Sequence, residues 1–246
     1  MIRLVAALAL FGISFGYVEA AVVVYLRALY QPIHERFHPD RDPGDLFPVL
    51  TLDELRLARP EATRWLAIEL GREAATLGML AGLGLAVGQN WQKGLAVFAM
   101  AFGFWDISFY ITLRFVIGWP RSFFEWDLLF LLPVPWVGPV MAPIIVSGSL
   151  IAGGALILFG ERAGRSLSLT RGHLLCLCAG AFAILAAFCK DFEVIVTGAM
   201  PAPFAWPLFA AGELIGLLTL LHAWRGAGRW PAGNLDQGSP PQVRPA

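Results

Sequence analysis

The chain has 246 residues, of which 57% are hydrophobic and 15% are charged, and its formal net charge is zero. A chain this apolar, with a mean hydropathy of +0.65, cannot cover a soluble globular surface, so we expect an integral membrane protein in a lipid bilayer. The balanced charge does not favour a nucleic-acid partner, and none is predicted.

Six apolar runs predict helices that cross the membrane, because about 20 apolar residues span the hydrocarbon core. The predicted spans cover residues 4–29, 63–88, 94–117, 137–159, 174–189 and 205–222. The first run imitates a secretory signal, but it stays apolar through Leu26, so we expect an uncleaved span. The predicted fold class is therefore all-α, a polytopic membrane helical bundle, with residues 1–225 forming a single transmembrane domain.

The loop over residues 30–62 is too long to be a simple connection. Within it, Thr51 followed by Glu54 three residues later matches a capping box, which predicts a short interfacial helix. After the last span, residues 226–246 are rich in Gly, Pro, Ser and Gln, so a disordered C-terminal tail is predicted.

Basic residues concentrate in the cytoplasmic loops of membrane proteins. Counting Lys and Arg gives nearly a tie between the two faces, but the segment 161–173 is almost purely basic, whereas the arginines of loop 30–62 are mixed with acids. We therefore expect both termini in the cytoplasm and loop 30–62 on the outer face.

The stretch WDLLFLLPVPWVGPVMAP, residues 126–143, carries four prolines where the fourth span should begin. Proline removes a backbone donor and disfavours helix at the preceding residue, so a broken or re-entrant segment is predicted over 132–143. Two interpretations stay open. Trp119, Trp126 and Trp136 form an interfacial belt that positions the fourth span, or the broken segment covers a site.

Six charged side chains fall inside the predicted spans, where each costs roughly 2.5–3.5 kcal/mol on insertion scales. They are Glu19, Glu69, Arg72, Glu73, Asp106 and Glu213. Helical spacing places Glu69, Arg72 and Glu73 on one face of the second span, and Asp106 shares a face with Tyr110. We expect all of these side chains to face the bundle interior and to meet in one pocket in the outer half of the bilayer.

Small residues beside two of these acids predict close contacts between helices. Gly12 and Gly16 share the face of Glu19, and Gly212 and Gly216 flank Glu213. Neither acid is therefore expected to face lipid.

A single guanidinium can pair well with about two carboxylates, so the remaining acids must be protonated, hydrated or bound to a cation. This balance indicates a proton carrier, a general acid/base or an ion site, although a buried polar network that only fixes helix register stays open. The predicted substrate- or ion-binding residues are Glu19, Glu69, Arg72, Glu73, Asp106, Tyr110, Trp126 and Asp127.

Motifs for metals, cofactors and nucleophiles are weak. His34 and His38 could bind a metal together with Asp40, but a surface pair is favoured and no metal site is predicted. The chain has no Gly-x-Ser-x-Gly, phosphate loop or haem-attachment motif, so catalytic residues and cofactors stay unassigned. The three cysteines are interpreted as small packing residues: Cys176, Cys178 and Cys189.

Several short motifs between residues 10 and 145 carry a resemblance. They are Tyr17-Val18-Glu19-Ala20, Phe104-Trp105-Asp106-Ile107, Gly118-Trp119-Pro120-Arg121-Ser122, Trp126-Asp127, Pro133-Val134-Pro135-Trp136 and Gly138-Pro139. Together they resemble an uncharacterised group of bacterial multi-span inner-membrane proteins. The resemblance implies a bacterial inner-membrane setting and nothing about chemistry.

The leading hypothesis is a small transporter or ion/proton-coupled membrane protein, in which the carboxylates titrate or bind a cation and residues 126–143 gate access. One alternative is an intramembrane enzyme that acts on a lipid or small apolar substrate, with Asp106 or Glu73 as general acid/base. The other is an accessory subunit of a membrane complex. Six spans are few for an alternating-access transporter unless a homo-oligomer forms, and the enzyme hypothesis lacks a nucleophile and base, so the sequence leaves the choice open.

Overall fold

The computed structural model describes residues 1–42, 44–165, 167 and 169–226, and the predicted tail from residue 227 onward lies outside them. The described chain forms α1 (Ile2–Phe37), α2 (Leu52–Ala58), α3 (Ala62–Val87), α4 (Trp91–Ile117), β1 (Trp126–Phe130), β2 (Trp136–Pro139), α5 (Met141–Arg162), α6 (Arg171–Cys189), α7 (Phe192–Val196) and α8 (Trp206–Arg225). The all-α prediction is thus confirmed, with one small sheet added.

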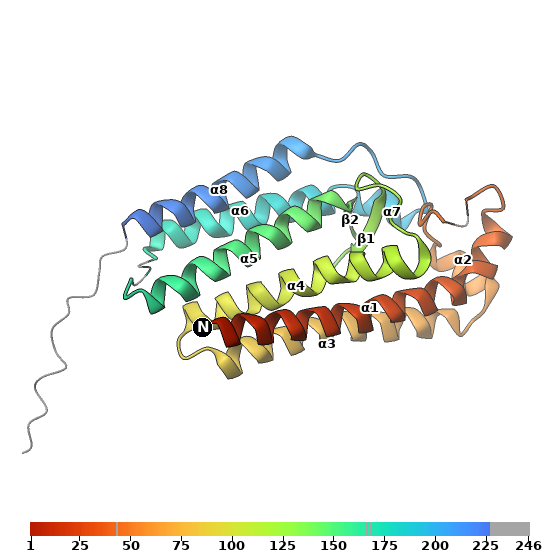
Figure 1. Cartoon of the computed structure of the whole chain (residues 1–246). Coiled ribbons are helices and arrows are strands. Elements are labelled where there is room, and N and C mark those ends of the chain that lie inside the picture. The colour runs from red at the N-terminus through yellow and green to blue at the C-terminus, as the bar shows by residue number, and fades with distance from the viewer. Residues whose placement is uncertain (43, 166, 168, 227–246) are drawn as a thin grey trace, which may run out of the picture.

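Six helical segments are long and apolar enough to cross a membrane: α1, α3, α4, α5, α6 continued by α7, and α8. The chain is therefore a multi-pass membrane protein. In Figure 1 the long helices run side by side, with the N-terminus and the last turn of α8 at one end, here called the terminal end. The opposite end, here called the hairpin end, carries α2, α7 and the two strands. Helix α4 packs against α1, α3 and α5, whereas α6 packs mainly against α8.

Glycines bring the central helices into close contact. A Cβ added at Gly12 of α1 would lie 2.9 Å from the backbone nitrogen of Trp105, and one at Gly16 would lie 2.6 Å from the Trp105 carbonyl oxygen. On the other side of α4, a Cβ at Gly154 would lie 2.7 Å from the Ala96 carbonyl oxygen. The small-residue packing predicted for the first span is confirmed.

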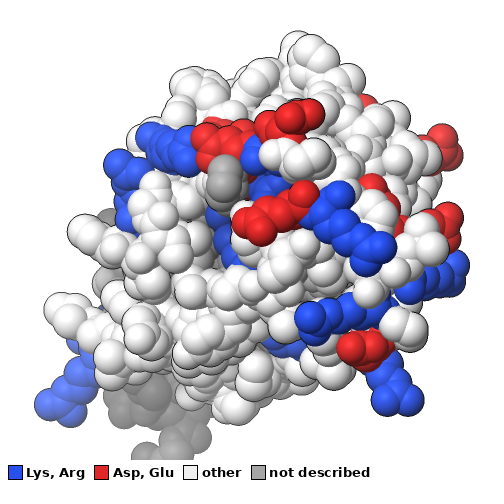
Figure 2. Space-filling view, turned by 90° about the vertical axis from the view of Figure 1, so that its right-hand side faces the viewer, with Lys and Arg blue, Asp and Glu red and all other residues white. Residues whose placement is uncertain are grey.

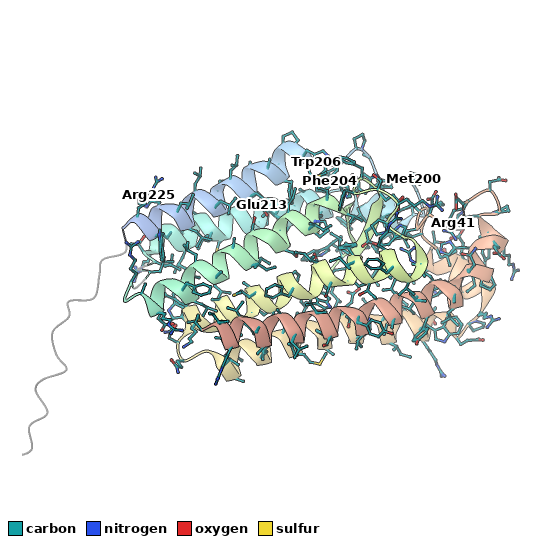
Figure 3. The ribbon with its side chains drawn as sticks, viewed as in Figure 1. Arg41, Met200, Phe204, Trp206, Glu213 and Arg225 are labelled. Carbon is teal, nitrogen blue, oxygen red and sulfur yellow. The ribbon has the colours of Figure 1, made fainter. Side chains whose placement is uncertain are left out.

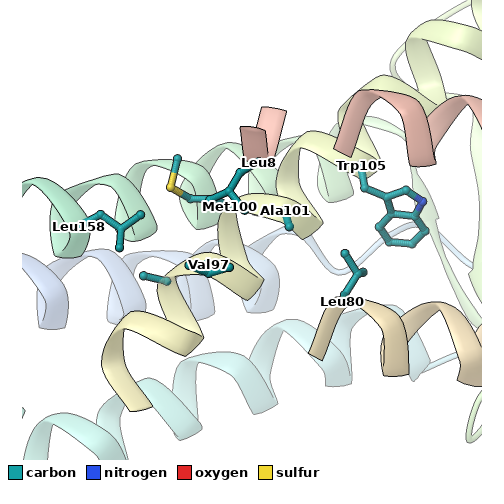
Figure 4. Packing of buried hydrophobic residues seen from close by; sticks show 8 residues of the cluster. Leu8, Leu80, Val97, Met100, Ala101, Trp105 and Leu158 are labelled. Atoms are coloured by element: carbon teal, nitrogen blue, oxygen red, sulfur yellow. The ribbon is translucent and has the colours of Figure 1, made fainter. Parts of the chain in front are cut away.

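The largest apolar core cluster lies where α1, α3, α4 and α5 meet. Figure 4 shows its members Leu8, Leu80, Val97, Met100, Ala101, Trp105 and Leu158. The Trp105 indole lies at one edge of the cluster, with its nitrogen on the side away from Leu158. Trp105 therefore marks the boundary between the apolar core cluster and the part of the bundle toward the hairpin end.

The predicted break before the fourth span is confirmed, and its form is an antiparallel β-hairpin. Asp127 stands opposite Gly138, and the register shifts between Leu128 and Phe130. The break was predicted to extend to Pro143, but α5 already begins at Met141. Pro143 fits in the first turn because the backbone N–H it lacks would have no partner within the helix there.

The first helix continues to Phe37, so the prediction that it ends near residue 29 is wrong. Pro32 lies inside the helix, yet hydrogen bonding resumes with the His38 N–H donating to the His34 carbonyl at 2.7 Å. Ile33 packs against Leu55 of α2, and this contact stabilises the extra turns.

The short helix predicted from its capping box is present as α2. The Glu54 N–H donates to Thr51 Oγ1 at 3.2 Å, and the Thr51 N–H donates to Glu54 Oε2 at 2.7 Å. Burial raises the pKa of Glu54, but the hydrogen bonds from Thr51 and the nearby His38 outweigh it, so this pKa lies below its usual value.

Of the three tryptophans assigned to an interfacial belt, Trp119 is buried in the bundle, whereas Trp126 and Trp136 are half-buried, so a belt formed by these two stays a prediction. Trp119 is only 4% exposed, and the Arg27 guanidinium lies over its ring at 4.1 Å from the centroid. Trp126 packs into an aromatic cluster, and Trp136 lies 5.3 Å from the ring of Phe130. The hairpin folds back onto the helices, so its large side chains point inward.

Candidate functional site

A cavity of about 530 Å³ enters the bundle at the hairpin end. Its walls come from α1 to α7, the hairpin and the loop before α2, and most of the lining side chains are apolar or aromatic. This volume lies within the roughly 300–1,000 Å³ of small-molecule sites. Figure 2 looks onto the hairpin end, where acidic and basic side chains gather on one face.

The structure brings together most of the predicted site residues. Those that line the cavity are Glu19, Glu69, Arg72, Glu73, Asp106, Tyr110 and Asp127. They come from α1, α3, α4 and β1, as the helical spacing predicted for the first three elements. Their roles stay predictions, but their convergence is a feature of the fold.

One predicted site residue, Trp126, and one further intramembrane acid, Glu213, lie elsewhere. Trp126 packs into the aromatic cluster around Phe204 and is not part of the cavity wall. Glu213 accepts a hydrogen bond from Ser149 Oγ at 2.7 Å, between α8 and α5, and Figure 3 places it near the middle of α8. The prediction that Glu213 joins the pocket is wrong, because the close contact of Gly212 with Gly180 packs α8 against α6 rather than against the cavity.

Arg72 pairs with two carboxylates, as its charge balance predicted. Its Nε donates to both carboxylate oxygens of Glu69 at 3.0 Å, and its terminal nitrogen forms an ion pair with Glu19. Thr76 Oγ1 also donates to Glu19, at 3.0 Å. Because Glu19 lies on α1 and the others on α3, this group joins the two helices.

Glu73 and Asp106 receive hydrogen bonds only from neutral donors. The Leu131 N–H at the hairpin turn donates to the two Glu73 oxygens at 3.1 and 2.9 Å. Ser147 Oγ on α5 donates to Asp106 Oδ2 at 2.8 Å. Among the described residues neither carboxylate forms an ion pair, so Arg72 balances only the other two acids.

Asp127 is held by the hydroxyl of Tyr110, which donates to its Oδ2 at 2.8 Å. Asp127 is only 7% exposed. Burial raises the pKa of Asp127, and the nearby Arg27 guanidinium, the Tyr110 hydroxyl and the Leu128 N–H offset only part of this effect. The bond joins α4 to β1 at the cavity wall.

Sequence reasoning missed several donors that line the cavity. Buried side-chain nitrogens with no hydrogen-bond partner among the described residues occur at Arg27, His34, Arg41, Trp105 and Trp136; all but the His34 nitrogen can only donate. A buried polar hydrogen without a partner costs about 1–3 kcal/mol.

A helical stripe could have revealed part of this set. The cavity-lining residues of α1 recur at helical spacing from Glu19 through Arg27 to His34, beyond the predicted end of the span. Figure 3 shows Arg41, which follows this helix, at the hairpin end of the molecule.

In the described part of the chain, no group of three or more His, Cys, Asp or Glu residues lies close enough together to hold a metal ion. His38 pairs with Glu54 at 3.1 Å, whereas His34 lines the cavity. All three cysteines are free, and Cys176 and Cys178 are exposed on α6 rather than packed within the chain.

No protein-family model, curated protein or solved structure matches the chain. The resemblance to a bacterial multi-span group therefore stays a prediction. The geometry of the cavity is then the basis on which a function can be proposed.

Proposed function

We propose that the protein is a small proton-coupled transporter that carries a largely apolar molecule through the cavity. The observation that supports this most is that Glu73 and Asp106 line the cavity with neutral hydrogen-bond donors only. A carboxylate among membrane-spanning helices is costly unless it takes up a proton or a cation. Both groups are therefore suited to loading and releasing a proton next to a bound molecule.

The protonation state of Glu73 also affects the hairpin, which forms part of the cavity wall. The hairpin lines the cavity from Leu128 to Leu131, and the Leu131 N–H holds the Glu73 carboxylate. A carboxylate is a stronger hydrogen-bond acceptor than a neutral carboxylic acid, so protonation of Glu73 weakens the bond that fixes the hairpin turn. Proton uptake and opening of the hairpin would then be coupled.

The setting that goes with this proposal is a bacterial inner membrane, with the hairpin end on the outer side. The resemblance of the motifs supports the bacterial inner membrane. The orientation is supported by the basic residues at the terminal end, Arg162, Arg171 and Arg225, since cytoplasmic ends of membrane proteins are rich in Lys and Arg.

A second candidate, an intramembrane enzyme, is favoured by one observation. Asp106 and Tyr110 line the same cavity one helical turn apart, and the Tyr110 hydroxyl is already bound to Asp127. These groups could exchange protons with an enclosed apolar substrate. Such an enzyme would turn over in detergent without any gradient, whereas a transporter would not change its substrate.

The transport proposal can be tested with purified protein in liposomes. The vesicles are loaded with an apolar fluorescent dye, a pH gradient is imposed, and release is followed for the wild type, Asp106→Asn and Glu73→Gln. Glu213→Gln serves as the matched control, because it alters a buried carboxylate that lies outside the cavity.

We expect gradient-driven release with the wild type and Glu213→Gln, and loss of the gradient dependence in both cavity variants. Equal release from all four proteins would contradict the transport proposal. Infrared difference spectra between pH 5 and 9 supply a second measurement, since a protonated carboxyl band that disappears in Asp106→Asn identifies the group that carries the proton.

A further inference from the structure

We infer that the cavity takes a neutral, largely apolar ligand bearing at least one hydrogen-bond acceptor, such as an ester or ketone carbonyl, which the indole N–H groups of Trp105 and Trp136 hold. This inference rests on the proposed function, because it names the class of molecule that the transporter would carry. It concerns binding alone and can be tested without transport.

The two indoles are donors that the described chain leaves without an acceptor. Trp105 is 7% exposed, and the Nε1 atoms of both residues are buried with no partner. Both residues line the cavity, and each ring packs near Phe130, with centroid distances of 6.3 Å for Trp105 and 5.3 Å for Trp136. Both indoles therefore lie next to Phe130 in the cavity wall.

The carboxylates near the indoles already have their own donors. Asp106 is bound by Ser147 and Asp127 by Tyr110, so neither accepts from an indole in this structure. An indole nitrogen can only donate, and a buried one normally finds a partner. A bound molecule with a hydrogen-bond acceptor would supply the partner that these indole N–H groups lack.

The charges of the lining favour a neutral ligand. An anionic ligand beside the indoles would meet Glu73 and Asp106, while Arg72 is already occupied by two carboxylates. Arg27 and Arg41 also line the cavity, but Arg27 lies over the Trp119 ring and its charge acts on Asp127, and Arg41 donates to Gln31. A cation would find acids but could not accept a hydrogen bond from either indole. Aromatic side chains such as Phe102 and Phe188 form much of the remaining wall, which suits an apolar body.

The test uses two photoreactive probes of equal chain length, a methyl ester of a twelve-carbon acid and the corresponding alkane, each with the same diazirine on the chain. The full chain in lipid nanodiscs is labelled by light, and the labelled fraction is measured by intact mass. Trp105→Phe and Trp136→Phe are compared with the wild type. Trp91→Phe is the matched control, since Trp91 is 56% exposed at the other end of α4.

We expect the ester to label the wild type more than the alkane does, and the ester-to-alkane ratio to fall roughly two- to tenfold in each cavity variant, as for loss of one hydrogen bond. Trp91→Phe should keep the wild-type ratio. Peptide mapping should place the ester on α1, α3 or α4. If Trp105→Phe does not fold, Trp136→Phe gives the result alone, because it lies outside the core cluster.

Equal labelling of the wild type by ester and alkane would overturn the inference, and so would an unchanged ratio in the folded tryptophan variants. Labelling requires no gradient. A protein that prefers the ester but shows no gradient-driven release would therefore support the ligand class and contradict the transport proposal. A protein that shows gradient-driven release but no preference for the ester would support transport and contradict the ligand class.

Discussion

The face of α1 that meets α4 changes character at Glu19. Toward the terminal end, Gly12 and Gly16 bring the two backbones together and alkyl side chains fill the space. Toward the hairpin end, the same side of α1 continues through Val23 and Arg27 as the wall of a cavity. One helix therefore takes part in two kinds of packing.

The comparison shows which contacts hold the cavity in shape. At the terminal end, the core between α1, α3, α4 and α5 is apolar and packed by van der Waals contacts, and the ion pair of Lys93 with Glu161 lies outside that cluster. At the hairpin end four polar contacts join different elements: α1 to α3 through Arg72, α3 to the hairpin through Glu73, α4 to α5 through Asp106, and α4 to β1 through Asp127. A change to one of these groups should therefore affect how the walls are joined as well as local charge.

The largest expected effect is that of Arg72→Met, which leaves the buried Glu19 and the half-buried Glu69 without their cation. Breaking a buried ion pair by removing one partner costs about 3–5 kcal/mol. The apparent free energy of unfolding can be measured by titration with SDS. Adding Glu69→Gln should restore part of the loss, and a variant as stable as the wild type would show that polar bonds do not hold this end.

The glycine contact of the terminal end can be broken with a single methyl group. In Gly16→Ala the new Cβ would lie 2.6 Å from the Trp105 carbonyl oxygen, so overpacking should cost about 2–3 kcal/mol in the same titration. Gly78→Ala is the matched control, because nothing lies within 4 Å of its Cβ, and better helix propensity should leave stability unchanged or slightly higher. Equal stability of the Gly16→Ala and Gly78→Ala variants would contradict the claim that close glycine contacts hold the terminal end together.

The attachment of the hairpin should depend on an acceptor at position 73. Glu73→Ala removes the partner of the Leu131 N–H, so we expect the Leu131 amide to exchange with deuterium about tenfold faster. Glu73→Gln keeps a carbonyl acceptor and should exchange more slowly than the Ala variant. Identical exchange in all three proteins would mean that the hairpin is held by its apolar contacts alone.

The smallest effect concerns pH and Asp127. Burial raises its pKa in the folded state above the ordinary 3.8, so the folded protein binds this proton more tightly than the unfolded chain does. Its contribution to stability is present below pH 3.8 and is lost as pH rises through the folded pKa. Asp127→Asn keeps an acceptor for Tyr110 but cannot titrate. Melting temperatures of the wild type should therefore fall relative to the variant as pH rises above about 4, and parallel curves would contradict this.

Local patterns in the sequence predicted much of the fold. Hydropathy gave the six spans because crossing a membrane requires a long apolar run, and the Thr51 and Glu54 pair gave α2 because a capping box is local. The spacing of Glu69, Arg72 and Glu73 likewise placed them on one face.

What the sequence did not predict depends on contacts between distant segments. The prolines predicted a break, but pairing Trp126 with Pro139 as strands requires the helices on which the hairpin lies. The side to which Glu213 points depends on how α8 packs on α6, and the turns of α1 after Pro32 depend on Leu55. The free indole donors emerge only when the whole cavity wall is assembled.

The close approach of helices at glycines also limits how this protein can diverge. A Cβ at Gly103 would lie 2.6 Å from the Ser147 carbonyl oxygen, and Gly12, Gly16 and Gly154 are restricted in the same way. A side chain at any of these glycines would push backbones apart. Distant relatives should therefore still align by small residues four apart in the first helix and by small residues in the third and fourth spans, where Gly103 and Gly154 lie.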